Sequence, residues 1–187
     1  MRVCVQVNKL TAAGCIFKFW VADWFAKLNV KLGGDADKIR TTGRYMLEVW
    51  KAVGMDMRNV QFLWASDCIN KHADEYWGLV MDIATRSSLP RILRCGQIMG
   101  RSSCVEQLSA SQVFYPCMQC ADVFYLKADI CQLGLDQRKV NMLAREYCAA
   151  AHGPSARKPV ILSHGAMREA APAARVLKAR WRLSAQG

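Results

Sequence analysis

The chain has 187 residues and a mass of 21.0 kDa, enough for one ordinary domain with a proper core. Hydrophobic residues make up 52% of it and the mean hydropathy is +0.01, which excludes an intrinsically disordered chain. The net charge of +11 would suit a polyanion such as RNA, but more than half of this excess lies in the last thirty or so residues, so the charge does not by itself indicate RNA binding.

Residues 1 to 64 predict an alternation of helices and strands. The expected elements are a helix from Val3 to Ala13, a strand from Cys15 to Ala22, a long helix from Asp35 to about Val53, and a strand from Val60 to Trp64. Asp35 is predicted to cap the long helix, and Gly54 to end it.

Helices are predicted to dominate from about His72 to Lys127, with breaks near Ser87 to Pro90 and around Gly100 to Ser103. A third strand precedes Gly134, a helix runs from Gln137 to about Ala150, and Val160 to Leu162 forms a fourth strand. Because strands alternate with helices, we expect an α/β fold: a Rossmann-like parallel sheet flanked by helices.

The sequence shows neither a transmembrane segment nor a signal peptide. No run of ~18 uncharged apolar residues predicts a transmembrane helix, and the first residues do not have the pattern of a signal peptide. Nine cysteines without paired spacing indicate reduced thiols and the cytosol. Cys117 and Cys120 form a C-x-x-C, which is half of a zinc site; two thiols packed inside a helix is the simpler interpretation.

Three polar residues within an apolar helical stretch are the first candidate site. Tyr115, Gln119 and Asp122 are spaced i, i+4, i+7, so they share one face of a helix. A phenol, an amide and a carboxylate inside such a helix need partners, because burying them unpaired is costly. A bound polar ligand would supply those partners; neighbouring backbone or helix ends could also do so.

The second candidate site follows the third strand. Gly134 and Asp136 come between this strand and the next helix, an arrangement by which many α/β folds meet a nucleotide ribose. Asp136 is also well suited to be a helix N-cap. At the end of the first strand, Ala22 and Asp23 lie where a ligand crevice is expected, although Asp23 could again be only a cap.

The stretch from Tyr115 to Lys139 resembles the tyrosine-binding half of a tyrosyl-tRNA synthetase, a class I enzyme, of the archaeal and eukaryotic cytosolic type. The resemblance rests on the pattern Tyr-Pro-x-Met-Gln-x-x-Asp followed by Gly-x-Asp-Gln-Arg-Lys. Four further segments resemble the same family in the same order: Asn8 to Asp23, Lys51 to Ser66, Pro90 to Ser102 and Lys158 to His164.

The resemblance implies a role for each candidate residue. Tyr115 and Gln119 would contact the α-amino group of tyrosine, Asp122 its phenolic hydroxyl, and Gln137 the side of its carboxyl group. Ala22 and Asp23 would lie beside the tyrosine pocket. Asp136 would bind the ATP ribose, and Gly134 would leave room for the nucleotide. ATP with Mg²⁺ and tRNA-Tyr would be the other reactants. The helices between Trp77 and Ser102 would form a homodimer face, or else an ordinary pair of core helices.

The resemblance also defines what we expect to be missing. The family has a His-x-Gly-His-like phosphate loop before the equivalent of residue 8, and a Lys-Met-Ser-Lys-Ser-like motif after His164. This chain has neither. We therefore expect an incomplete catalytic domain over residues 1–164 and a basic, Ala/Arg-rich tail over residues 165–187, with a solvated helix from about Ala171 to Trp181 as one form of that tail.

Two functions follow from these observations. The first is a tyrosine–tRNA ligase, of which this chain would be a fragment that is inactive alone. The alternative is a non-catalytic protein derived from a synthetase, which binds tyrosine or serves as a dimer partner. Tyrosine binding without ATP–pyrophosphate exchange would support the alternative.

Overall fold

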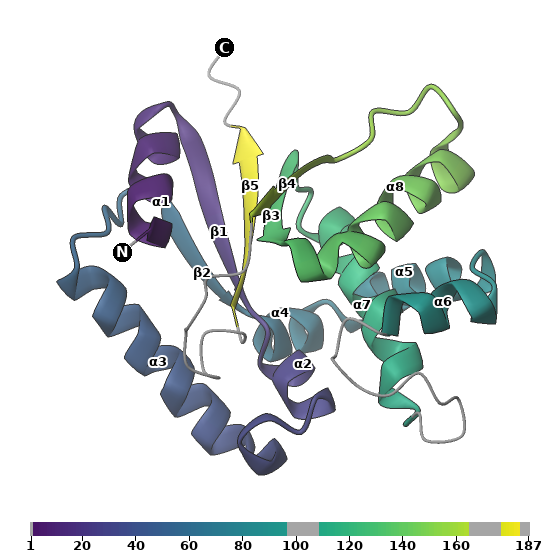
Figure 1. Ribbon diagram of the computed structural model, residues 1–187, viewed down its shortest axis with the longest axis horizontal. Coiled ribbons are helices and arrows are strands. Elements are labelled where there is room, and N and C mark those ends of the chain that lie inside the picture. The colour runs from purple at the N-terminus through teal and green to yellow at the C-terminus, as the bar shows by residue number, and fades with distance from the viewer. Residues whose placement is uncertain (1, 97–108, 165–176, 184–187) are drawn as a thin grey trace. The chain divides into compact units, whose positions relative to one another are not determined.

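The computed structural model describes residues 2–96, 109–164 and 177–183, which form two compact units (Figure 1). The first unit comprises Met1–Cys68 together with Met167–Gly187, and the second comprises Ile69–Ala166. The break that the sequence predicts around Gly100 to Ser103 lies outside the described residues.

The first unit is built on three strands. Its elements in chain order are α1 (Arg2–Ala12), β1 (Cys15–Val21), α2 (Asp23–Leu28), the 3-10 turn η1 (Lys31–Gly34), α3 (Ala36–Ala52), β2 (Val60–Trp64), α4 (Ala65–Lys71), which continues into the second unit, and β5 (Leu177–Leu183). Strand β1 pairs in parallel with β2, from Phe17 opposite Val60 to Val21 opposite Trp64. On its other side β1 pairs antiparallel with β5, from Cys15 opposite Leu183 to Val21 opposite Leu177.

Aromatic side chains form the core of the first unit. Phe19 of β1 is 1% exposed, and its ring stacks on Trp50 of α3 at 4.5 Å and on Phe62 of β2 at 4.9 Å between centroids. Asp35 caps α3 as predicted, because its carboxylate accepts hydrogen bonds from the backbone N–H groups of Asp37 and Lys38. These contacts hold α3 against the β1–β2 pair.

The second unit consists of packed helices and one β-α-β segment. Its elements are α5 (Ala73–Thr85), α6 (Leu89–Gly96), α7 (Ser111–Tyr125), β3 (Ile130–Gly134), the 3-10 turn η4 (Leu135–Gln137), α8 (Arg138–His152) and β4 (Val160–His164). Strands β3 and β4 are parallel, from Ile130 opposite Val160 to Gly134 opposite His164, and α8 connects them. A parallel pair joined through a helix is the unit from which Rossmann-like sheets are made.

The predicted α/β, Rossmann-like fold is confirmed, with parallel pairs of strands flanked by helices. The pairing of β1 with β5 is the exception, because it is antiparallel. The helix considered for Ala171 to Trp181 is wrong from Leu177 onward, where the chain forms a strand; residues 171–176 lie outside the described ranges. The sequence LKARWRL alternates apolar and basic residues, which is the period of a strand and outweighs the helix-favouring content of Ala and Arg.

Candidate functional site

The predicted polar face of a helix is present on α7. Tyr115, Gln119 and Asp122 all belong to this helix and are 7%, 0% and 0% exposed. Their i, i+4, i+7 spacing therefore places them on one face inside the second unit, as the sequence predicts.

A phenol from another helix holds the carboxylate of Asp122. The hydroxyl of Tyr76, on α5, lies 2.7 Å from Oδ1 of Asp122 and 3.1 Å from the carbonyl oxygen of Met118. Tyr76 is fully buried. A hydrogen bond to a buried carboxyl stabilises the fold, so this contact stabilises the packing of α5 on α7 and satisfies one acceptor of Asp122.

Sequence reasoning missed Tyr76. Its signal was present: Tyr76, Val80 and Ile83 recur at helical spacing and are all buried on α5, and a phenol on a buried face needs a hydrogen-bond partner. The ring of Tyr125 meets that of Tyr76 edge-on, at 5.4 Å between centroids, and this contact fixes the orientation of the phenol.

The residues after β3 form a 3-10 turn, and Asp136 lies within this turn instead of capping α8. Gly134 and Gln137 occupy the positions before η4 and before α8, and neither helix has a side-chain cap. The interpretation of Asp136 as an N-cap is therefore wrong. Asp136 is exposed, and its carboxylate accepts a hydrogen bond of 2.8 Å from the side-chain Nε2 of Gln137. Gly134 has φ −63°, which any residue adopts, so its conformation does not require glycine.

The other end of the Gln137 amide has no protein partner. Its Oε1 is buried and accepts no hydrogen bond from the part of the chain that the structure describes. Because buried polar atoms are almost always paired, this oxygen is an acceptor available to a ligand.

Two contacts fix α8, which begins directly after Gln137. The hydroxyl of Tyr147 donates to Oδ2 of Asp82 on α5 at 2.6 Å, and Arg91 of α6 forms an ion pair with Glu146 at 2.8 Å. Burial, followed by the hydrogen bond to Asp82, raises the pKa of Tyr147 well above its usual range, so the phenol remains a donor at physiological pH. The second half of α8 is thereby held against α5 and α6.

Ala22 and Asp23 lie in the first unit, at the end of β1. Ala22 takes the cap position of α2, and Asp23, 5% exposed, is the first helical residue. Its Oδ1 accepts from the backbone N–H groups of Ser66 (3.0 Å) and Trp24 (2.9 Å), and its Oδ2 accepts from the hydroxyl of Ser66. Since Ser66 follows β2, Asp23 links the carboxyl ends of two neighbouring parallel strands.

An arginine on α3 extends this link at the surface of the first unit. Arg40 Nη2 lies 2.7 Å from Oδ2 of Asp67, and its guanidinium lies over the ring of Trp64 at 4.8 Å from the centroid. The hydrogen bond from Arg40 lowers the pKa of the Asp67 carboxyl. Arg40, Ser66 and Asp67 were also missed from the sequence, because their partners are far away along the chain.

The C-x-x-C cysteines are packed inside α7. Cys117 and Cys120 are 4% and 0% exposed, and burial, followed by the influence of Cys95, raises the pKa of Cys117 to about 11. Among the described residues, no three His, Cys, Asp or Glu side chains are placed so that they could hold a metal ion. In the same ranges, no helix is long and apolar enough to cross a membrane.

Known proteins resemble this chain over most of its length. A family model described as tRNA synthetases class I (W and Y) matches residues 1–179. Two relatives from Arabidopsis thaliana, tyrosine–tRNA ligases 1 and 2, both cytoplasmic, are 63% and 66% identical over 160 and 159 residues. These matches cover 86% and 85% of this chain, but only 41% and 21% of the relatives.

Solved structures agree with this family. The Leishmania major tyrosyl-tRNA synthetase in complex with tyrosinol is 61% identical with a TM-score of 0.80, over 87% of this chain and 24% of that one. The enzyme from Aeropyrum pernix is 36% identical with a TM-score of 0.77, over 87% of this chain and 46% of that one. The tryptophanyl-tRNA synthetase from Campylobacter jejuni, at 18% identity, shares the fold.

The chain thus spans less than half the length of each of these relatives. The family resemblance seen in the sequence is confirmed, because the family model covers nearly the whole chain. This protein belongs to the class I tRNA synthetases that comprise the tryptophan and tyrosine enzymes.

Proposed function

We propose that this chain is part of a tyrosine–tRNA ligase, which activates tyrosine with ATP to tyrosyl-adenylate and transfers it to tRNA-Tyr. The names of the Arabidopsis relatives and the tyrosinol bound to the Leishmania enzyme support tyrosine as the amino acid. In this proposal residues 1–164 are part of the catalytic domain; the family model continues to residue 179, so only the last residues of the tail lie outside it.

The observation that carries the proposal is the buried carboxylate of Asp122 beside a phenol. Tyr76 already donates to Oδ1 of Asp122, and a carboxylate has about four acceptor positions. The hydroxyl of a bound tyrosine can therefore donate to the same group. Phenylalanine would be disfavoured, since it offers no donor to a charged group that is removed from water.

The amino end of the substrate would lie nearer to Tyr115 and Gln119. The resemblance implies that Gln137 contacts the side of the substrate carboxyl group. The buried Oε1 of Gln137, which has no hydrogen-bond partner among the described residues, instead favours a contact with the adjacent ammonium group, because an acceptor matches a donor and repels a carboxylate. The roles of Ala22 and Asp23 beside tyrosine stay predictions from the resemblance.

ATP would meet the chain at the end of β3. Asp136 is exposed there, so its carboxylate is accessible to ribose hydroxyls, and Gly134 just before it has no side chain that could obstruct the nucleotide. Mg²⁺ would accompany the ATP phosphates; the described residues form no cluster that could hold it.

These residues would contribute to the reaction by positioning tyrosine and ATP. The tyrosine carboxylate attacks the α-phosphate of ATP, a new carboxyl–phosphate bond forms, and pyrophosphate leaves. Holding the phenol, the ammonium group and the ribose fixes the two reactants in line, which can supply a large part of the rate enhancement without any covalent contribution from the protein. The residues proposed here bind and orient; none needs to exchange a proton.

The names of the relatives support a compartment for this chain. The Arabidopsis proteins are named cytoplasmic, and we propose the same compartment.

A homodimer face on α5 and α6 is supported by exposed apolar side chains there: Met81 is 60% exposed and Leu89 is 57% exposed.

The test is the tyrosine affinity of the chain and of its Asp122→Asn variant, measured by calorimetry with phenylalanine as the comparison ligand. We expect tyrosine to bind, phenylalanine to bind much more weakly, and Asp122→Asn to abolish that preference. Asp74→Asn is the matched control, because Asp74 is an exposed carboxylate on α5. Equal tyrosine binding by Asp122→Asn and the unsubstituted chain would overturn the assignment of the pocket.

ATP–pyrophosphate exchange separates the two functions considered from the sequence. Exchange by the chain would exclude the non-catalytic alternative. Specific tyrosine binding without exchange would instead favour a tyrosine-binding or dimer-partner role for the chain when it acts alone.

A further inference from the structure

A cavity of about 370 Å³ lies between α8 and β4 in the second unit, apart from the residues assigned so far. Seven of the described residues line it: Arg138, Asn141, Met142, Arg145, Val160, Ile161 and Ser163. Its volume is within the range of small-molecule sites.

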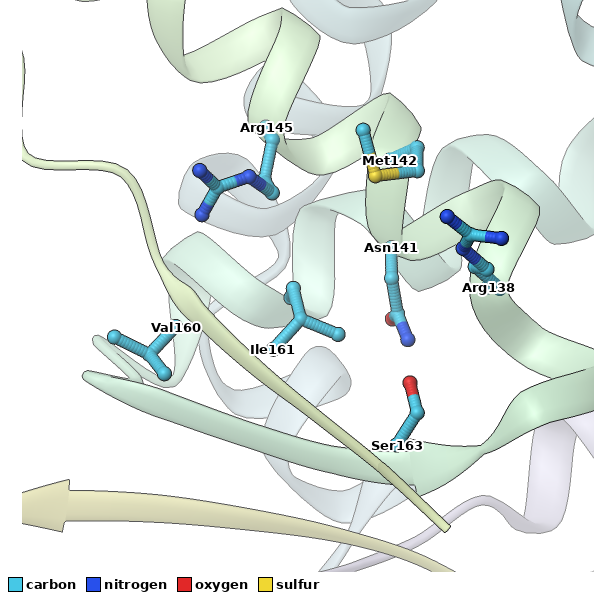
Figure 2. Close-up of a pocket in the computed structure, with 7 residues that line it drawn as sticks. All are labelled: Arg138, Asn141, Met142, Arg145, Val160, Ile161 and Ser163. Atoms are coloured by element: carbon cyan, nitrogen blue, oxygen red, sulfur yellow. The ribbon is translucent and has the colours of Figure 1, made fainter. Parts of the chain in front are cut away.

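The polar groups that line this cavity are hydrogen-bond donors or carry positive charge. Figure 2 shows the amide of Asn141 and the hydroxyl of Ser163 pointing toward one another, with Arg138 and Arg145 on either side in this view. Among the described residues that line the cavity, none carries a carboxylate. This composition favours a negatively charged ligand with several acceptor oxygens.

The amide of Asn141 provides independent support for a ligand. Asn141 is 1% exposed, and its Nδ2 has no hydrogen-bond partner in the described part of the chain. An amide nitrogen that is removed from water and unpaired costs free energy. A ligand oxygen in the cavity would satisfy it.

The two arginines play different parts. Arg145 donates to the carbonyl oxygen of Pro159 at 2.8 Å, so it ties α8 to the start of β4 and contributes its charge from a fixed position. Arg138 is exposed and takes part in no ion pair with the described residues. Its guanidinium can therefore turn toward an anion and offer two parallel donors.

We propose that Arg138, Asn141, Arg145 and Ser163 form a binding site for a phosphate group, either free phosphate or a phosphate ester. Asn141 and Ser163 hold the oxygens at the buried end, and Arg138 closes the site from the solvent side. This proposal does not depend on the proposed ligase function.

The test is thermal unfolding of the chain with increasing inorganic phosphate, at an ionic strength held constant with sodium chloride. We expect a saturable rise in the unfolding temperature beyond the effect of chloride. Asn141→Asp keeps the size of the side chain but adds a negative charge, so it should abolish the rise. Arg138→Gln removes one charged donor pair and should weaken phosphate binding by about tenfold.

Arg94→Gln is the matched control, since Arg94 is an exposed arginine on α6 that does not line the cavity. It should bind phosphate like the unsubstituted chain. Because Arg138 is exposed, its variant tests the site even where Asn141→Asp fails to fold. The proposal is overturned when phosphate has no effect beyond chloride, which would mean a hydrated cavity, or when Arg138→Gln and Arg94→Gln behave alike.

A second ligand identifies the source of the phosphate. Ribose 5-phosphate is titrated in the same way against the same variants. Tighter binding than inorganic phosphate, sensitive to Asn141→Asp, would assign the site to a phosphate ester, because the cavity is larger than one phosphate group. Equal or weaker binding would assign it to free phosphate.

Discussion

The hydroxyl of Tyr76 lies 2.7 Å from the carboxylate of Asp122 and joins α5 to α7 across 46 residues of sequence. Both side chains are fully buried. A carboxylate inside a protein requires such a donor, because the free energy of leaving it unpaired is high. The same pair therefore maintains the packing of the two helices, and under the proposed function it keeps an acceptor in place for a substrate hydroxyl.

Tyr76→Phe should destabilise the chain by about 1–3 kcal/mol, because it removes the hydroxyl that donates to a buried charged group and changes little volume. Urea unfolding of both proteins measures the difference. Tyr45→Phe is the control: Tyr45 is 66% exposed and should unfold like the unsubstituted chain. Equal free energies of unfolding for Tyr76→Phe and Tyr45→Phe would show that the phenol–carboxylate contact contributes nothing to stability.

Ser66→Ala should lower stability by about 1–3 kcal/mol as well, since Asp23 loses a hydroxyl donor while keeping the two backbone N–H groups. The exposed Ser155 provides a control variant, Ser155→Ala. Tyrosine affinity measured on the same samples distinguishes two roles for Asp23. Lower stability with unchanged affinity assigns Asp23 to the structure of the first unit; a matching loss of affinity would instead place it in the substrate pocket.

Gly43→Ala and Gly78→Ala should have opposite effects on the unfolding free energy. A β-carbon at Gly43 of α3 would lie 2.6 Å from Cη2 of Trp64, so the ring must move, at a cost of about 1–3 kcal/mol. A β-carbon added at Gly78 of α5 would meet no other described atom within 4 Å, so alanine should stabilise that helix by up to about 1 kcal/mol. Chemical denaturation of both variants checks the pair, and stabilisation by Gly43→Ala would contradict the close approach of α3 to Trp64.

Asp56 should titrate at unusually low pH. The side chain and the backbone N–H of Arg58 donate to its carboxylate and lower its pKa to about 2. An unfolded aspartate titrates at about 3.9, so the folded chain holds this proton more weakly. The resulting stabilisation is complete above the unfolded pKa and is lost as the pH falls through the folded one.

An NMR titration of the Asp56 carboxyl carbon measures this pKa directly. In Arg58→Gln the pKa should return toward the value of an unfolded aspartate, because the charged donor is gone. An unchanged titration curve in that variant would mean that the local backbone, and not Arg58, sets the pKa.

Local sequence patterns predicted most of the fold because each element carries its own signals. Strand β2 has the predicted bounds, and Asp35 caps α3 as its residue type indicates. The polar face of α7 was predicted because Tyr115, Gln119 and Asp122 lie within two turns of one helix. Periodicity suffices for such features, since all their determinants are adjacent in sequence.

The features that were missed depend on distant residues. Asp122 meets Tyr76 across 46 positions, and Asp23 meets Ser66 across 43. Nothing in the local pattern of either residue identifies its partner. Asp136 was misassigned because a 3-10 turn places Gln137, and not Asp136, before α8. For β5 two signals in the sequence conflict: the content of Ala and Arg favours a helix, whereas the alternation of apolar and basic residues favours the strand that is formed.

The pairing of β1 with β5 has a consequence for the order in which the chain can fold during synthesis. It joins Val21 to Leu177, and the whole second unit is translated between these two residues. Until β5 is synthesised, the backbone groups on the β5 side of β1 stay unpaired, and unpaired strand edges promote aggregation. The helical unit of Ile69–Ala166 is complete before β5 emerges. Ribosome-bound chains should therefore complete the second unit before the β5 side of β1 is paired.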